Sequence, residues 1–293
     1  MSTGECFWYI GESLRPWESA VAGALARALL KEGLPLRCFS GGGGENLGIP
    51  DLLSWNSLTL VERTVLIGTR GALWHLWGEP PFWWNFLRIR ARTVHTRFDG
   101  VCEWKGHPTR LAASLCSAGE TYIPPTFDVK IHWIEDGAAP ENEDAPPLFV
   151  LFQGTWEDRK LFGGAAGELS GTLQITEEDS RGGKLPPSGN AFLLLPRAGL
   201  SSALLAAHGA LMGIPAAAAP SPLFDEILGK EGYIRLPPSK DREGVLSALR
   251  LLAGEAGRNA AAAARRYGME QFPPSRGAGK LQSLYRTLSG KDE

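Results

Sequence analysis

Basic and small residues in the second half of the chain are arranged in a way that could bind phosphate. Arg197 and the segment Gly199–Ser202, which holds one glycine and two serines, follow an apolar run and precede a helical pattern that ends near Gly213. Backbone N–H groups at a helix start are unpaired, and the helix dipole adds positive charge there, so anions bind readily. We expect Ser201 and Ser202 to cap this helix. The segment predicts a site for a phosphate-bearing ligand.

The first half places polar residues after two predicted strands. Gly11, Glu12 and Arg15 lie in the loop after a strand at 6–10, and His95, Arg97 and Asp99 end a strand at 92–96. Open α/β sheets bind ligands at the carboxyl ends of their strands, so both groups could contact a substrate. Asp99–Gly100 also suits a simple turn.

A third unusual segment covers residues 73–92. It holds Trp74, Trp77, Trp83 and Trp84 beside Arg88, Arg90 and Arg92. Buried core packing is one interpretation of such aromatics. The other is a surface that contacts lipid or stacks a sugar or base, because aromatic rings with adjacent arginines suit an anionic bilayer and single-stranded nucleic acid.

Strand and helix patterns alternate on both sides of an acidic stretch. Strands are predicted at 6–10, 34–39, 64–68, 92–96, 148–152, 171–176 and 191–195, and helices at 16–31, 158–169 and 276–288. Such alternation predicts parallel sheets flanked by helices. The stretch 135–147 has five acidic residues and no basic residue, which is typical of a linker. We therefore expect domains at 1–134 and 148–275, with a final helix at 276–293 that could pack on the first domain.

Composition excludes several classes of protein. The 293 residues are 43% hydrophobic and 21% charged, which indicates a globular chain. A net charge of −2 argues against a dedicated nucleic-acid binder. The four cysteines show no metal-site or disulfide spacing, so a reducing compartment fits best. The sequence shows neither a secretory leader nor a run long enough to span a membrane, so we expect a cytoplasmic protein.

The second half resembles the nucleotide-binding domain of GT-B glycosyltransferases, specifically the retaining family 4 enzymes. That family has a strand, a short loop, two glutamates eight residues apart and a small-Gly-x-Pro motif. Leu193–Pro196 and Ala210–Pro215 match this frame, and Gln153-Gly154 followed by Lys160 has the spacing of the family's diphosphate-binding Gly and Lys. Tyr122–Asp128 resembles the end of the acceptor domain. The resemblance covers roughly two thirds of the chain.

The resemblance implies a GT-B fold, with two Rossmann-like parallel-sheet domains facing across a cleft, and a set of site residues. The implied catalytic residues are His95, Asp99 and Lys160. The implied donor-binding residues are Gly11, Gly154, Thr155, Arg159, Lys160, Arg197, Gly199, Leu200, Ser201, Ser202, His208 and Glu226. On the acceptor side we expect Glu12, Arg15, Trp83, Trp84 and Arg97.

Two departures from the family pattern concern the donor site. Leu200 and His208 occupy the positions of the paired glutamates, and Thr155 replaces an arginine expected beside the diphosphate. Each lost charge-assisted bond costs about 1.5–3 kcal/mol, so donor binding would weaken unless other residues compensate.

The resemblance implies a hexosyltransferase-like enzyme that moves a sugar from a UDP- or GDP-linked donor, retaining its configuration. Neither a metal nor a cofactor is expected. The acceptor is left open among a glycan, a lipid-linked molecule, a small molecule and nucleic acid, and peripheral membrane contact is possible. Two alternatives stay open: a non-catalytic descendant that binds a nucleotide sugar or a partner, and a transferase that acts on nucleic acid through the Trp/Arg segment.

Overall fold

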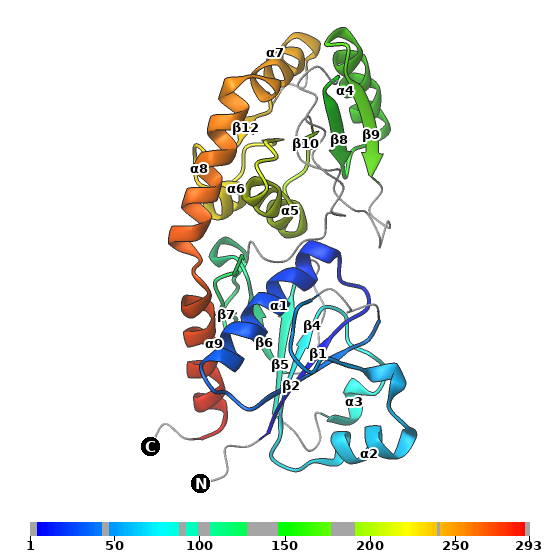
Figure 1. The fold of residues 1–293 in the computed structure, drawn as a ribbon, viewed down its shortest axis with the longest axis vertical. Helices are drawn as coiled ribbons and strands as arrows, with labels where there is room; N and C mark the ends of the chain where they lie inside the picture. The colour runs from blue at the N-terminus through cyan, green and yellow to red at the C-terminus, as the bar shows by residue number, and fades with distance from the viewer. Residues whose placement is uncertain are drawn as a thin grey trace. The chain divides into compact units, whose positions relative to one another are not determined.

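The computed structural model describes residues 5–42, 47–87, 92–98, 106–127, 146–176, 191–238 and 241–290 (Figure 1). The chain forms two compact units: the first comprises Met1–Ile131 together with Phe272–Glu293, and the second His132–Gln271. The final helix therefore belongs to the same unit as the N-terminal sheet. Most of the predicted linker at 135–147 lies outside the described residues.

The first unit is built on a parallel sheet with the strand order β3-β2-β1-β4-β5-β6-β7. The strands are β1 (Cys6–Ile10), β2 (Leu36–Ser40), β3 (Leu53–Ser54), β4 (Leu73–Trp77), β5 (Arg92–Arg97), β6 (His107–Arg110) and β7 (Thr121–Tyr122). Every pairing is parallel. Because the order reverses at β1, the switch point of this sheet lies between β1 and β4.

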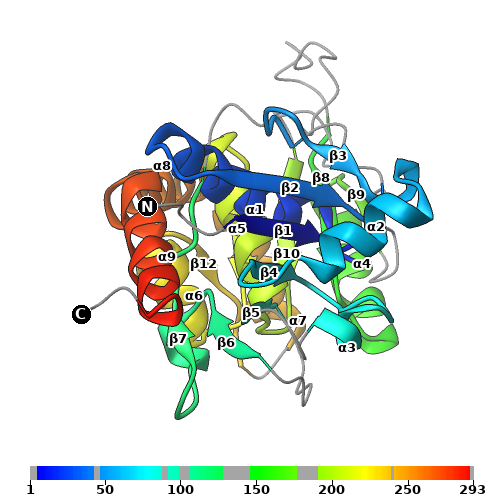
Figure 2. The same cartoon turned by 90° about the horizontal axis from the view of Figure 1, so that it is seen from below.

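Helices cover both faces of this sheet. They are α1 (Pro16–Lys31), α2 (Leu60–Gly68), α3 (Trp84–Leu87) and α9 (Pro274–Leu288), with short 3₁₀ turns at Trp55–Ser57 and Ala113–Leu115. Figures 1 and 2 place α1 and α9 on one side of the sheet and α2 and α3 on the other. Pro16 at the first turn of α1 suits a helix start, because its fixed φ is helical. The absence of its N–H costs little there, since the first N–H groups of a helix have no partner within the helix.

An aromatic core fills the face beneath α2 and α3. It contains Phe7, Tyr9, Phe39, Trp55, Trp74, Trp83 and Trp84. The rings of Trp55 and Trp83 stack with centroids 4.4 Å apart, and Trp83 meets Tyr9 edge-on at 5.1 Å. Such pairs stabilise a core by about 0.5–1.5 kcal/mol beyond burial of their area.

The second unit has a parallel sheet with the order β12-β11-β10-β8-β9. Its strands are β8 (Leu148–Phe152), β9 (Thr172–Thr176), β10 (Ala191–Leu195), β11 (Ala216–Ala218) and β12 (Ile234–Arg235). Here the chain direction across the sheet reverses between β8 and β10, which makes the carboxyl ends of those two strands the expected ligand site.

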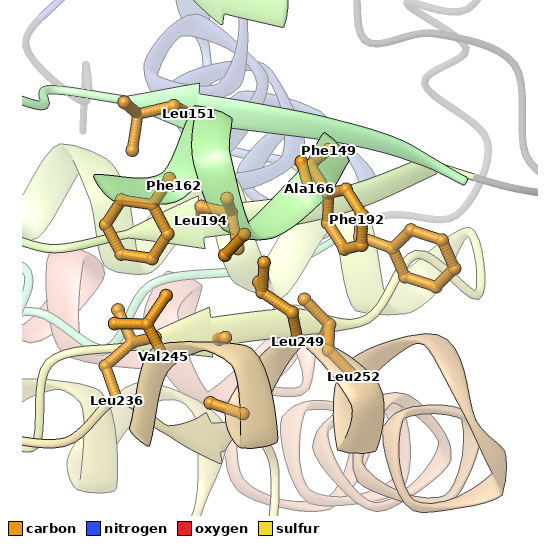
Figure 3. Close-up of a cluster of buried hydrophobic side chains, with 13 residues drawn as sticks. Phe149, Leu151, Phe162, Ala166, Phe192, Leu194, Leu236, Val245, Leu249 and Leu252 are labelled. Atoms are coloured by element: carbon orange, nitrogen blue, oxygen red, sulfur yellow. The ribbon is translucent and has the colours of Figure 1, made fainter. Parts of the chain in front are cut away.

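Helices again form two layers around this sheet. They are α4 (Trp156–Glu168), α5 (Leu200–Leu211), α6 (Pro222–Leu228), α7 (Arg242–Ala253) and α8 (Glu255–Gln271). Figure 3 shows the core beneath α4 and α7, where Phe149 and Leu151 of β8 and Phe192 and Leu194 of β10 meet Phe162, Val245 and Leu249. On each strand these apolar side chains alternate with ones that face the opposite layer.

The strand predictions at 6–10, 148–152 and 191–195 are confirmed residue for residue. The prediction of a strand at 64–68 is wrong, because this segment ends helix α2. Thr59 and Glu62 form a capping box: the Thr59 hydroxyl accepts from the Glu62 N–H, and the Glu62 carboxylate accepts from the Thr59 N–H at 2.7 Å. This cap starts a helix and outweighs the modest β preference of a Thr-Val-Leu-Ile run.

Candidate functional site

The switch point of the second unit joins two loops through one hydrogen bond. Gln153 follows β8, and the loop at 196–199 follows β10 and leads into α5. The Ser202 hydroxyl donates to Gln153 Oε1 at 2.8 Å, which ties the first turn of α5 to the end of β8. The two loops therefore form one local structure at the place where the sequence predicts a phosphate site.

Gln153 has a strained backbone at this point. Its φ is 58°, in the left-handed region that side-chain-bearing residues seldom adopt, at a cost of about 1–2 kcal/mol. Such strain persists where the surroundings enforce it, and it is common at ligand sites.

Two helices begin beside Gln153, but only one of them is capped by a side chain. In α4 the Thr155 backbone N–H and hydroxyl donate to Asp158 at 2.8 and 2.9 Å, and Thr155 accepts from the Asp158 N–H. Helix α5 begins after Gly199, which offers no side-chain cap. The start of α5 therefore lacks the side-chain cap that α4 has, and helix starts of this kind bind anions readily.

The expectation that Ser201 and Ser202 cap α5 is wrong. Gly199 is the N-cap, and both serines lie inside the first turn, 1% and 0% exposed. Helix α5 is buried along its length, which draws Ser202 inward to Gln153 rather than back to its own N–H groups.

The predicted donor-site cations differ in their surroundings. Arg197 is exposed in the loop after β10, and Arg159 is half-buried on α4. Lys160 is exposed, and its ammonium lies 5.1 Å from the ring centre of Trp156, itself 67% exposed. Gly154 and Thr155 lie at the β8–α4 junction. Glu226 is half-buried on α6. A donor contact by any of these residues stays a prediction.

The two residues at the positions of the family glutamates are buried in α5. Leu200 is 0% and His208 3% exposed. Eight residues of helix separate them by about 12 Å along the axis. A ribose contact by His208 requires its ring to face a ligand, so the observed burial favours a packing role.

The switch point of the first unit brings Gly11 together with the end of β4. The Gly11 N–H donates to the Trp77 carbonyl at 2.9 Å. Glu12 is exposed in the following loop, and Arg15 precedes α1, where its N–H donates to Glu18 at 2.9 Å. Gly78, just after β4, has a φ of 87°, and a Cβ there would meet Leu14 at 2.6 Å, so only glycine fits.

His95 on β5 is linked to this loop. Its Nε2 lies 2.6 Å from the Gly78 carbonyl, and it is 4% exposed. A carbonyl only accepts, so Nε2 carries the proton and Nδ1 is left as an acceptor. Burial is the main factor that lowers the pKa of His95 to about 4, and the charges of Arg97 and Arg110 act in the same direction. His95 is therefore neutral at pH 7.

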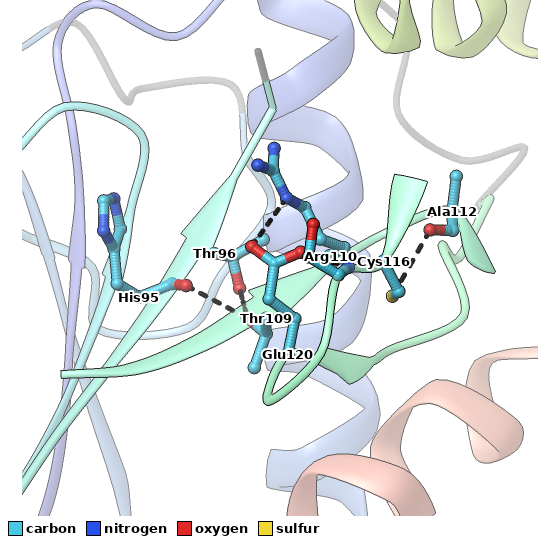
Figure 4. A network of polar contacts seen from close by, with 8 residues as sticks. His95, Thr96, Thr109, Arg110, Ala112, Cys116 and Glu120 are labelled. Atoms are coloured by element: carbon cyan, nitrogen blue, oxygen red, sulfur yellow. Dashed lines mark hydrogen bonds and ion pairs between the residues drawn. The ribbon is translucent and has the colours of Figure 1, made fainter. Parts of the chain in front are cut away.

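Strand β5, which carries His95, and its neighbour β6 each end in an arginine. Arg97 and Arg110 are paired in the β5–β6 register, and Figure 4 shows the Arg110 guanidinium meeting Glu120, with Nε 3.1 Å from the carboxylate. Sequence reasoning missed Arg110 and Glu120 because the short strands β6 and β7 carry weak patterns. Asp99, another of the three predicted catalytic residues, lies outside the described residues, as do Arg88 and Arg90.

The surface interpretation of the tryptophan segment is wrong. Trp74, Trp77 and Trp84 are 0% exposed and Trp83 is 6% exposed. Trp74 and Trp77 belong to strand β4 and Trp84 to helix α3, which the sequence interpretation left unassigned. Trp83 immediately precedes α3, and all four side chains pack inside the first unit. An acceptor or bilayer contact needs an exposed ring, so Trp83 and Trp84 are core residues.

A buried polar chain that the sequence did not predict crosses the first sheet. Trp8 Nε1 donates to the Tyr285 hydroxyl at 2.9 Å, so this hydroxyl donates to His75 Nδ1 at 2.5 Å. His75 Nε2 then donates to Thr96 at 2.6 Å, which contacts Thr109 at 2.6 Å. The Thr109 hydroxyl lies 3.3 Å from the His95 carbonyl oxygen, a contact drawn in Figure 4. The chain connects α9 to the strands that carry His95.

Within the residues that the structure describes, no helix combines the length and the apolar character needed to cross a membrane. The same residues hold no group of three or more His, Cys, Asp or Glu side chains placed to bind a metal ion.

Comparisons with known proteins connect this architecture to solved structures. No protein-family model matches the sequence, and no curated protein matches it. A glycosyltransferase from Rickettsia africae superposes with a TM-score of 0.62 at 13% identity, over 100% of both chains. Anabaena HepE, solved in complex with UDP and glucose, gives 0.60 at 9% identity over 96% of this chain and 99% of its own.

A third solved structure has a similar degree of likeness. S. aureus MnaA with UDP gives a TM-score of 0.55 at 8% identity, over 99% of this chain and 98% of its own. At such identities the similarity shows the fold. The predicted α/β class, with two parallel sheets of the GT-B type, is confirmed.

Proposed function

We propose that this protein is a glycosyltransferase that uses a nucleotide-diphosphate sugar, with the diphosphate bound at the start of α5. The observation that carries the proposal is the uncapped α5 N-terminus beside the strained Gln153, at the switch point of the second sheet. This is where open α/β folds bind phosphate groups. The UDP complexes of HepE and MnaA, which share the fold, support a UDP-linked donor.

The proposed chemistry depends on stabilising the leaving diphosphate. When the sugar departs, negative charge grows on the β-phosphate, and N–H groups and cations aimed at it lower the barrier. The α5 first turn supplies the N–H groups, and Arg197, Arg159 and Lys160 are the proposed cations. Following the family 4 resemblance, the proposal includes retention of configuration and assigns charge stabilisation to these groups without a metal ion.

A non-catalytic nucleotide-sugar-binding protein is the second candidate. Leu200 and His208 supply no carboxylate where family 4 enzymes have glutamates, and both side chains are buried. A protein with this pair could bind a donor without turning it over. The nucleic-acid alternative loses its basis, because the tryptophans that suggested it are in the core.

Gly199→Asp tests the proposed phosphate site without damaging the fold. Gly199 has φ −158° and ψ 152°, which any residue adopts, and an added Cβ would be no closer than 3.8 Å to Gln153 or Ser202. An aspartate there would cap α5 and stabilise the protein by only a few tenths of a kcal/mol, because glycine is itself a tolerated N-cap. It would also place a negative charge where the diphosphate binds.

The experiment measures thermal stabilisation of each variant by UDP, GDP and their sugar conjugates. We expect Gly199→Asp to melt higher than wild type yet lose stabilisation by nucleotide. Gly199→Asn, an uncharged cap of similar size, should retain part of the binding. Equal nucleotide binding by Gly199→Asp and wild type would refute the α5 site. Donor hydrolysis or transfer, assayed alongside, separates the enzyme from the non-catalytic binder.

A further inference from the structure

Three strands of the first unit end in a row of polar side chains. Arg97 of β5 pairs in register with Arg110 of β6, which pairs with Tyr122 of β7. Side chains in register on parallel strands lie on the same face, and neighbouring strands are about 4.8 Å apart. His95 stands two residues before Arg97 and so shares this face.

The described residues leave this row with an excess of positive charge. Glu120 is the carboxylate that meets Arg110, and its second oxygen accepts from the Ser117 N–H at 2.8 Å. Burial opposes ionisation of Glu120, but the Ser117 N–H and the charges of Arg110 and Arg97 lower its pKa. No described carboxylate forms an ion pair with Arg97.

Two polar atoms on this face lack partners in the described structure. Arg97 Nε is buried with no hydrogen-bond partner, and so is His95 Nδ1. Nε is a donor, whereas Nδ1 is an acceptor because the proton of His95 is held at Nε2 by the Gly78 carbonyl. Buried groups without partners are costly, so native proteins seldom retain them without a role. One ligand that carries both an anion and a hydroxyl would pair with each.

We propose that Arg97, Arg110 and His95 form an acceptor subsite for a hydroxyl-bearing molecule with a phosphate or carboxylate group. The planar guanidinium of Arg97 would hold the anion, since its donors match two oxygens at once. His95 Nδ1 would accept a hydrogen bond from the hydroxyl. The assignment of this ligand as an acceptor rests on the proposed function, whereas the anion site itself stands on the first unit alone.

Binding to the full-length protein is measured by calorimetry with four probes. Glucose 6-phosphate tests a soluble phosphate ester, glucuronate a carboxylate, and phosphatidylcholine vesicles containing phosphatidic acid a lipid headgroup. UDP reports on the donor site. The variant is Arg97→Gln, and Arg92→Gln is the matched control, because exposed Arg92 lies at the opposite end of the same strand.

We expect at least one anionic probe to bind wild type and Arg92→Gln equally, and Arg97→Gln at least tenfold more weakly, with UDP binding unchanged. Arg97→Lys should recover part of the affinity, since it restores charge but not the planar fork. Anion binding by wild type that Arg97→Gln leaves unchanged would overturn the subsite. Loss of UDP binding in Arg97→Gln would assign it to the donor instead. Arg97-dependent anion binding without any UDP binding would keep the subsite and reject the proposed function.

A measurement on wild type covers the case in which Arg97→Gln fails to fold. Phenylglyoxal modifies accessible arginines, and peptide mass spectrometry locates the adducts. The binding probe should slow modification of Arg97 and leave Arg92 unaffected. Equal modification of Arg97 with and without every anionic probe, at concentrations up to tens of millimolar, would overturn the proposal.

Discussion

The hydroxyl of Tyr285 donates a hydrogen bond to Nδ1 of His75 across 210 residues of chain, at 2.5 Å. Both side chains are buried, and the hydroxyl also accepts from Trp8 Nε1. This bond fixes His75 as the neutral tautomer that is protonated at Nε2. It therefore sets the direction of every later bond in the chain through Thr96 and Thr109.

Tyr285→Phe should destabilise the first unit by about 2–4 kcal/mol. The change removes one oxygen but leaves two buried groups, Trp8 Nε1 and His75 Nδ1, without a partner, and each such loss costs about 1–3 kcal/mol. Urea unfolding measures the difference. Ser283→Ala, which removes an exposed hydroxyl from the same helix, should change stability by less than about 0.5 kcal/mol. Equal effects of the two variants would mean that the polar chain contributes nothing.

Acid should destabilise the first unit between pH 6.5 and pH 4. Burial lowers the pKa of His95 to about 4, and it also lowers the pKa of His75 well below its usual value. Unfolded histidines titrate near pH 6.5. In this range the unfolded chain therefore binds more protons than the folded chain, and the stability falls as the pH is lowered. His95 alone would contribute about 3 kcal/mol to this loss. The contribution of the neutral histidines to stability is fully present above pH 6.5.

His95→Gln is the variant that isolates this contribution. The glutamine amide can still donate to the Gly78 carbonyl but takes up no proton. We expect urea unfolding curves at pH 7.5 to resemble those of wild type, whereas the loss of stability toward pH 4.5 becomes smaller. An unchanged pH slope would show that His95 titrates normally in the folded protein.

Truncation of two adjacent aromatic residues should reduce stability by very different amounts. Trp83→Ala removes a 6% exposed ring from the aromatic core, at a cost of about 3–5 kcal/mol. Phe82→Ala removes an 82% exposed ring and should cost less than about 0.5 kcal/mol. Denaturant midpoints measure both. Comparable values for the two variants would contradict the buried placement of Trp83.

Cations of the proposed donor site should affect nucleotide binding rather than stability. Arg197 is exposed after β10, so Arg197→Gln should leave unfolding unchanged and weaken UDP binding roughly 10–100-fold, the equivalent of one charge-assisted bond. Arg250→Gln removes an exposed charge from α7 and is the matched control. UDP binding that falls equally in both variants would indicate a nonspecific effect of net charge.

Lys160→Gln tests separately whether Lys160 binds the diphosphate, as its spacing from the family's diphosphate-binding glycine implies. The Lys160 ammonium lies 5.1 Å from the centre of the exposed Trp156 ring, so no ion pair holds it away from a ligand in this arrangement of the described residues. We expect weaker UDP binding, with kcat reduced more than KM is raised, because the charge acts chiefly on the leaving group. Unchanged kinetics would remove Lys160 from the site.

Sequence patterns predicted the parts of the fold that depend on local chemistry. The continuous apolar runs at β8 and β10 identified buried parallel strands, and Pro16 marked the start of α1. Strand β4 escaped prediction because its tryptophans suit a core and a surface equally well from sequence. Only the fold shows that Trp55 comes from another segment to stack on Trp83.

The candidate sites likewise contain some features that the sequence predicted and others that only the fold shows. The glycine and serine pattern located the start of α5, but the bond between Ser202 and Gln153 joins residues 49 positions apart and has no local signal. Arg110 joins Arg97 only through strand register. His75 and Tyr285 are single residues whose partnership depends on the return of the last helix to the first sheet. No spacing rule connects such residues before the topology is known.

The return of α9 to the first unit has a consequence for biosynthesis. During translation the N-terminal sheet emerges early, yet Leu281 and Tyr285, which complete its buried layer, are made last. Until then Trp8 and His75 lack the hydroxyl that pairs them. The second unit is continuous in sequence and can fold while the first still waits. A nascent chain stalled before residue 272 should therefore expose the first unit to chaperones and proteases. The first unit can complete its folding only after α9 has been synthesised.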